Sequence, residues 1–193
     1  MRAQRWTNTV ATTTAAALLL LTTGPGRAPE TPLTPTGTNG LVPAVARTWP
    51  VGTRPAVLRA WEPPPTPYAR GHRGIDLAAA PGTPVRAVAS GRVSFAGQVA
   101  GKGVVSVELN GTGTPPLRTT YEPVRPTVAK GDEVRAGQVV AITETTSSHC
   151  AGTCLHWGLR RADTYLNPLA LLPPWLLHGP PPRLLPVLDV PLP

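Results

Sequence analysis

The sequence predicts an all-β domain built from many short antiparallel strands. Between residues 81 and 160, apolar and polar residues alternate in short runs, and a period of two places successive side chains on opposite faces of a strand. Turn signals such as Asn110-Gly111 and Gly131-Asp132 separate these runs, and the first is typical of a β-hairpin. No long stretch repeats apolar residues at helical spacing, so the pattern favours the all-β class.

The elements are expected in a simple order along the chain. Residues 68–76 have a loop-like composition, with Gly71 and Gly74 among them. Strands are then expected over residues 84–88, 92–96, 103–109, 117–121, 138–142 and 155–160. The clearest strand is 103–109, which is rich in valine and ends at a turn signal. The strand at 155–160 is expected to be the last.

Proline usage predicts one folded domain with flanking segments. The 26 prolines crowd into residues 25–67 and 173–193 and are sparse between them. We therefore expect the β domain over residues 68–172, a Pro/Thr-rich linker over 29–67 and a Pro/Leu-rich tail over 173–193. Residues 1–28 are typical of a signal peptide, because arginines precede a short uncharged run that ends in leucines. That run is shorter than the roughly 20 apolar residues of a stable membrane span.

A signal peptide predicts a secreted protein, and this affects how the two cysteines are interpreted. Cys150 and Cys154 are the only cysteines in the chain, and outside the cytosol such a pair is expected to form a disulfide. The net charge is +8, but there is no Lys/Arg run and no interleaving with aromatic residues, so nucleic-acid binding is not expected. A basic secreted domain is compatible with an anionic polymer such as a cell wall, and equally with an ordinary solvated surface.

Three residues form a candidate zinc site. His72 and Asp76 are four residues apart, and His156 follows in the last expected strand. Two imidazoles and one carboxylate are a common ligand set for catalytic Zn²⁺, and they leave a fourth position for water. On a strand, His156 shares a face with Cys154 and Gly158, while Leu155, Trp157 and Leu159 point into the core. Each motif alone has a commoner explanation, a surface pair for His72 and Asp76 or a hydrogen-bonded histidine for His156, and the combination favours a metal site.

The same motifs resemble the M23 (lysostaphin/LytM-like) family of peptidoglycan endopeptidases. The resemblance covers roughly residues 70–172 and rests on His72-x-x-x-Asp76, Cys154-x-His156, two glycine- and valine-rich runs (82–93 and 128–138) and the closing Asn167-Pro168-Leu169. It implies an M23-type antiparallel β-sheet core, Zn²⁺ held by His72, Asp76 and His156, and peptidoglycan or another cell-envelope polymer as the partner. The chain departs from the family at both catalytic histidines, whose positions hold Cys154 and Pro123.

Three other residues are candidates for the missing catalytic groups. Glu122 lies beside Pro123 and is a competent base, although adjacent strand residues face opposite sides, which would turn it away. His149 precedes Cys150, and a disulfide could hold its loop over the metal; a solvent-exposed loop residue is the simpler interpretation. Cys154 could act as a thiol or become a fourth zinc ligand if reduced. In a disulfide it could do neither.

Two functions from different classes follow. The first is a secreted, cell-wall-associated zinc metallopeptidase that cuts peptidoglycan peptide cross-links with weak or altered activity. The second is a catalytically inactive module that binds the wall or regulates a wall hydrolase. The intact ligand set favours the first, and the replaced histidines favour the second. A biotinyl/lipoyl carrier domain shares strand and turn patterns of this kind, but no lysine of this chain stands in a carrier context.

Overall fold

The computed structural model describes residues 42–66, 68–145 and 153–179. Its strands run in chain order β1 (Val57–Arg59), β2 (Gly74–Ala78), β3 (Pro84–Arg86), β4 (Gly91–Val99), β5 (Lys102–Leu109), β6 (Leu117–Glu122), β7 (Val124–Pro126), β8 (Glu133–Val134), β9 (Val139–Thr143), β10 (Cys154–Arg161) and β11 (Thr164–Leu166). Two short helices follow, the 3-10 helix η2 (Pro168–Leu171) and α1 (Pro174–His178). The predicted all-β class is confirmed.

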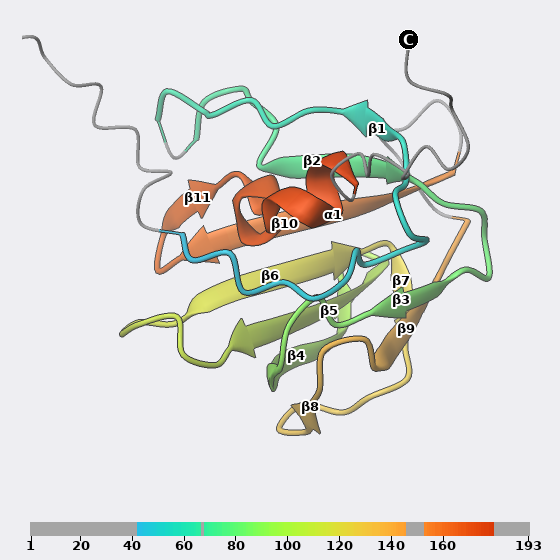
Figure 1. Ribbon diagram of the computed structural model, residues 1–193. Helices are drawn as coiled ribbons and strands as arrows, with labels where there is room; N and C mark the ends of the chain where they lie inside the picture. Colours follow the sequence, from blue (N-terminus) through green and yellow to red (C-terminus); the bar gives the residue numbers. More distant parts are fainter. Residues whose placement is uncertain (1–41, 67, 146–152, 180–193) are drawn as a thin grey trace, which may run out of the picture. The chain divides into compact units, whose positions relative to one another are not determined.

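The strands form two sheets that are antiparallel throughout. The larger sheet has eight strands in the order β1-β2-β10-β6-β5-β4-β8, with β11 paired to β10. The smaller sheet has the order β3-β9-β7. Figure 1 shows the larger sheet running from β1 at the top to β4 and β8 at the bottom, with β3, β7 and β9 at one side. Because β2, β10 and β6 are neighbours, residues far apart in the sequence meet at the centre of the sheet.

One face of the larger sheet packs into the core. Leu155, Trp157 and Leu159 are buried in it, as their alternation on the last expected strand predicts. Trp157 also stands edge-on to Trp49, with 6.2 Å between ring centroids. The opposite face carries His156 and Gly158 and is therefore left for a site.

The folded part begins earlier than the expected boundary at residue 68. Ala46, Trp49 and Val51 are buried in the core, and β1 pairs with β2. The described residues 42–66 are therefore part of the domain and not a free linker. This extension is hard to predict from the sequence, because the isolated apolar residues between these prolines repeat with neither a strand nor a helix period.

The C-terminal side also differs from the expectation. The strand at β10 is not the last, because β11 pairs with it after the turn at Ala162 and Asp163. The first part of the expected tail packs on the domain, since the indole N–H of Trp49 donates to the carbonyl of Leu176 over 3.0 Å. Residues 1–41, which include the expected signal peptide, lie outside the described residues, as do residues 180–193. No helix in the part that the structure describes is long and apolar enough to span a membrane.

Candidate metal centre

Three adjacent strands place three polar side chains in one row. His156 on β10 is the direct partner of Asp76 on β2 and of Glu122 on β6. Directly opposed residues of an antiparallel pair project to the same face of the sheet. Asp76, His156 and Glu122 therefore line up across β2, β10 and β6, on the face opposite the core.

His72 reaches this row from just before β2. Its backbone pairs with Glu62 in an isolated β-bridge, and the chain bends at Arg73 before β2 begins. The loop-like context expected for residues 68–76 is correct for His72 but wrong for Asp76, which lies within β2. This short bend brings two residues four positions apart onto one point, which an uninterrupted strand would not do.

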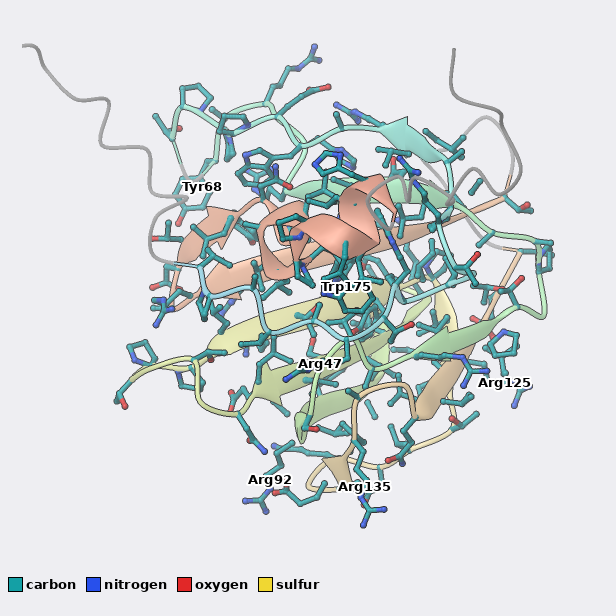
Figure 2. All side chains as sticks on the ribbon, viewed as in Figure 1. Arg47, Tyr68, Arg92, Arg125, Arg135 and Trp175 are labelled. Carbon is teal, nitrogen blue, oxygen red and sulfur yellow. The ribbon has the colours of Figure 1, made fainter. Side chains whose placement is uncertain are left out.

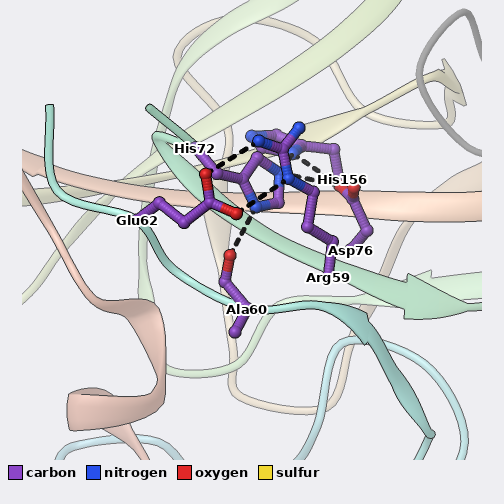
Figure 3. A network of polar contacts seen from close by, with 6 residues as sticks. All are labelled: Arg59, Ala60, Glu62, His72, Asp76 and His156. Atoms are coloured by element: carbon purple, nitrogen blue, oxygen red, sulfur yellow. Dashed lines mark hydrogen bonds and ion pairs between the residues drawn. The ribbon is translucent and has the colours of Figure 1, made fainter. Parts of the chain in front are cut away.

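The ligand atoms of the three predicted residues form a compact triangle. His72 Nε2 lies 3.2 Å from Asp76 Oδ1 and 3.2 Å from His156 Nδ1, and His156 Nδ1 lies 2.8 Å from Asp76 Oδ1. Figure 3 shows the three side chains converging. Donor atoms bound tetrahedrally to Zn²⁺ at about 2.0–2.1 Å stand roughly 3.3 Å apart, so the spacing suits such an ion.

A backbone contact fixes the proton on one of these rings. His72 Nδ1 lies 2.7 Å from the carbonyl oxygen of Ala60, and a carbonyl oxygen only accepts hydrogen bonds. His72 Nδ1 is therefore the donor of this contact, and Nε2 is the ring atom that faces Asp76 Oδ1. A ring N–H bound to a carbonyl oxygen is the usual support of a metal-ligating histidine, because it turns the other ring nitrogen toward the metal. The donor set thus fits a divalent metal.

Burial adds to this chemistry. His72 and Asp76 are 5% and 1% exposed, and a carboxylate is rarely so buried without a partner that compensates its charge. On the exposed rim, Arg59 and Glu62 form an ion pair of 2.9 Å, visible in Figure 3. The hydrogen bond from Arg59 lowers the pKa of the Glu62 carboxyl. This pair braces the segment that supplies both the Ala60 carbonyl and the bridge to His72.

Two paired glycines lie beside the His156 ring, and only one of them is in a position where an added Cβ atom would clash with it. Gly74 on β2 is the partner of Gly158 on β10. A Cβ added at Gly74 would lie 2.4 Å from the Trp157 carbonyl oxygen and 2.6 Å from His156 Nε2. A Cβ at Gly158 would meet only ordinary contacts, the nearest at 3.6 Å. Gly74 is therefore required for the position of His156, whereas Gly158 keeps the sheet surface open.

A groove of about 420 Å³ lies on this surface beside His156. Its walls come from β4, β5, β6, β10 and β11 and from Arg73, and its lining residues are Arg73, Phe95, Val99, Val104, Ser106, Arg118, Thr120, Glu122, His156, Gly158, Leu159, Arg160 and Tyr165. Glu122 faces the groove, so the expectation that strand alternation turns it away is wrong. Alternation shows only that Glu122 and Pro123 point to opposite sides, and Pro123 is the buried one. Because Glu122 is the direct partner of His156, its side chain points to the same face as His156.

The other candidates for catalysis lie elsewhere. Cys154 is 1% exposed and is paired with Ala78 at the end of β10, two residues from His156. His149 and Cys150 lie outside the described residues. Sequence reasoning missed the groove arginines Arg118 and Arg160. Their signal is the two-residue period itself, because Arg160 shares a face with His156 and Arg118 is its partner on β6.

Comparison with known proteins agrees with this geometry. A family profile described as Peptidase family M23 matches residues 70–168, just over half of the chain. This chain belongs to peptidase family M23. The matched region of this M23 domain contains His72, Asp76 and His156 as well as the groove.

Several curated proteins are similar in sequence to this M23 domain. An uncharacterized protein of Mycobacterium tuberculosis is 41% identical over 129 residues, covering 64% of this chain and 50% of the relative. The chain thus spans about half the length of the curated mycobacterial relatives it matches. DD-carboxypeptidase/endopeptidase Mpg of Neisseria gonorrhoeae is 32% identical over 103 residues, covering 53% of this chain and 23% of Mpg.

Among solved structures, the catalytic domain of the prophage-encoded M23 protein EnpA from Enterococcus faecalis gives a TM-score of 0.51 at 26% identity, covering 63% of this chain and 94% of that domain. The catalytic domain of lysostaphin from Staphylococcus simulans gives a TM-score of 0.51 at 24% identity, covering 63% and 92%. These likenesses establish the M23 fold for the domain described above.

Proposed function

We propose that this protein is an exported zinc metallopeptidase that cleaves peptide cross-links of peptidoglycan, more slowly than relatives that keep both catalytic histidines. The observation that carries the proposal is the triangle of His72, Asp76 and His156 at the side of a peptide-sized groove. Membership of family M23 supports the metal and the peptide substrate. The names of Mpg and lysostaphin, a DD-carboxypeptidase/endopeptidase and an antimicrobial peptidase, support a cell-wall substrate.

His72, Asp76 and His156 would hold Zn²⁺. Bound there, zinc polarises the scissile carbonyl and lowers the pKa of water. The Ala60 carbonyl accepts from His72 Nδ1 and so turns Nε2 toward the other two ligands, and Gly74 leaves room for the His156 ring. The groove along β6 and β10 orients the peptide and excludes bulk water from one side of it.

Glu122 is the residue we assign as general base. It is the direct partner of His156 on β6 and lines the groove, so its carboxylate can accept a proton from the attacking water and return it to the leaving amine. Pro123 has no side-chain proton to offer. A single carboxylate in place of two histidines is consistent with a slow reaction, because loss of a placed acid or base costs about 10²–10⁴-fold.

We further propose a disulfide between Cys150 and Cys154. The structure supports it on one side only, because Cys154 is buried and is not a free cysteine. Such a bond would remove Cys154 from acid–base chemistry and constrain the segment between the two cysteines, next to His149 in the sequence. Titration of the non-reduced, denatured protein with a thiol reagent should find no free thiol; two free thiols would rule the bond out.

The replaced histidines give a specific reason to keep a second candidate function, a module that binds the wall or regulates another wall hydrolase without turnover. The two candidates share the fold and the groove. They differ in whether the protein cuts purified wall, and in whether substitution of Glu122 lowers a rate of hydrolysis or changes binding alone.

Two measurements test the proposal. Metal analysis of the full chain should find about one Zn²⁺, absent in His156→Ala and retained in the matched control His178→Ala, whose histidine lies in α1. Hydrolysis of purified wall should be slow, abolished in His156→Ala and lowered at least tenfold in Glu122→Gln with zinc retained. Zinc that survives His156→Ala would refute the site. Zinc binding without any hydrolysis would select the second candidate.

A further inference from the structure

Two arginines lie side by side on adjacent strands of the groove, and the part of the chain that the structure describes gives neither a polar partner. Arg118 on β6 and Arg160 on β10 are directly opposed, and both side chains line the groove. Like charges directly opposite each other on neighbouring strands destabilise a sheet. Within the described residues, neither guanidinium makes a hydrogen bond or an ion pair with another protein group. Glu108 is the other strand partner of Arg118 and does not pair with it.

The surroundings do not relieve this repulsion. Arg73 is a third cation on the groove wall, and its guanidinium lies 5.4 Å from the ring centre of Tyr165, the strand partner of Arg160. Glu122 is the only carboxylate that lines the groove in the part of the chain that the structure describes, and it stands opposite His156 rather than beside the arginines. The far end of the groove is therefore positively charged.

We propose that the arginine pair, Arg118 and Arg160, is a subsite for a carboxylate of the peptide substrate. This deepens the proposed function, on which it rests, by assigning the substrate as an anionic peptide. A planar guanidinium donates two parallel hydrogen bonds to a carboxylate, and a carboxylate between two guanidinium groups replaces their repulsion by attraction.

The subsite lies at a defined distance from the metal ligands. Arg160 follows His156 by four residues on β10, which at a strand rise of about 3.3 Å per residue is roughly 13 Å. An extended peptide covers this distance in about four residues. On the opposite wall, Phe95, Val99 and Val104 are apolar. The preferred ligand is thus an extended peptide with small or apolar residues near the metal and a free carboxylate a few residues away.

Binding of synthetic peptides tests the subsite without requiring cleavage. The probe is a fluorescent peptide with alanines flanking one glutamate, compared with the same peptide in which glutamine replaces glutamate and the C-terminus is amidated in both. The full-length protein is measured with a chelator present, so that no cutting occurs. The glutamate peptide should bind at least tenfold more tightly than the glutamine peptide, and the difference should shrink as salt rises.

Substitutions then locate the effect. Arg118→Gln and Arg160→Gln should each weaken binding of the glutamate peptide roughly tenfold and leave the glutamine peptide unchanged. The matched control is Arg125→Gln, because Arg125 is exposed on β7 in the smaller sheet (Figure 2) and does not line the groove. Each groove variant should unfold at the same or a higher denaturant concentration than the native protein, because it removes one of two opposed charges.

This stability result separates a binding role from a structural one. If both groove variants bind as Arg125→Gln does, or if the native protein fails to distinguish glutamate from glutamine, the subsite is refuted. Those outcomes leave the zinc and hydrolysis tests of the proposed function unaffected, because the peptide assay is made on metal-free protein and the arginine variants keep His72, Asp76 and His156.

Discussion

Gly74→Ala should damage the candidate metal centre, whereas Gly158→Ala at the paired position should not. The added methyl at Gly74 would stand 2.4 Å from the Trp157 carbonyl oxygen and 2.6 Å from His156 Nε2, about an ångström closer than ordinary contact. The Trp157 carbonyl belongs to the central strand of the larger sheet, so it yields only with the strand. Overpacking of this kind costs about 1–3 kcal/mol, and relief by rotation of the His156 ring would displace its Nδ1 atom from the triangle.

Gly158→Ala is the matched control because the two glycines face each other on β2 and β10. Its methyl would lie 3.6 Å from the Arg73 carbonyl oxygen and 3.9 Å from His156 Nε2. Neither glycine has a positive φ, so backbone strain does not separate the two variants. Replacing a strand glycine by alanine without a clash gains roughly 0.5–1 kcal/mol, and Gly158→Ala should be neutral or slightly stabilising.

The assays are urea unfolding in the presence of a chelator and zinc titration against a competing chelator. Gly74→Ala should unfold with a free energy lowered by about 1–3 kcal/mol and should bind zinc about 10–100-fold more weakly, as expected when the surroundings of a ligand are disturbed. Equal unfolding free energies and equal zinc affinities for the two variants would refute the argument that Gly74 is required for the position of His156.

Two further predictions concern the core. Burial raises the pKa of Tyr121 to about 12 against the opposing hydrogen bond from the Val88 N–H; since the native state holds this proton more tightly than the unfolded chain, stability should fall as pH rises from about 10 to about 12, by roughly 2–3 kcal/mol. Tyr121→Phe should flatten that part of the stability curve, and an unchanged slope would count against the shift. Trp49→Ala should lower the free energy of unfolding by about 3–5 kcal/mol, measured in urea; a change below 1 kcal/mol would mean that residues 42–66 contribute little to the fold.

The strands β3, β4, β5, β6, β9 and β10 could be predicted because each has a local signal, whereas the two- and three-residue strands β7, β8 and β11 could not. Alternation marks β5 and β10, and the Asn110-Gly111 turn signal closes β5. The same two-residue period predicts that His156 and Trp157 point to opposite faces of the sheet. Because Trp157 is in the core, His156 must lie on the face that carries the candidate site. What lacked a local signal was missed: β1 has only three residues, and the burial of Trp49 depends on packing against Trp157, more than a hundred residues later in the sequence.

The candidate site shows the same division. The identity of His72, Asp76 and His156 follows from spacing, but their convergence depends on the bend at Arg73 and on the pairing of β2 with β10. The orientation of Glu122 was mispredicted for a related reason. Alternation along one strand gives relative faces only, and the face of Glu122 was set by its register with His156 on a neighbouring strand.

The register also places the candidate metal ligands and the proposed general base on different strand pairs. The metal triangle is built by β2, β10 and the bridge at His72, and its two most buried members, His72 and Asp76, depend on contacts to Ala60 and to the strand pair. Glu122 comes from β6, on the other side of β10, and contributes to none of these distances. Replacing the histidine positions by Cys154 and Pro123 therefore leaves the metal set intact. In the proposed function, Glu122 on β6 would supply the base for slow hydrolysis, and in the proposed subsite the arginine pair on β6 and β10 would act on binding alone.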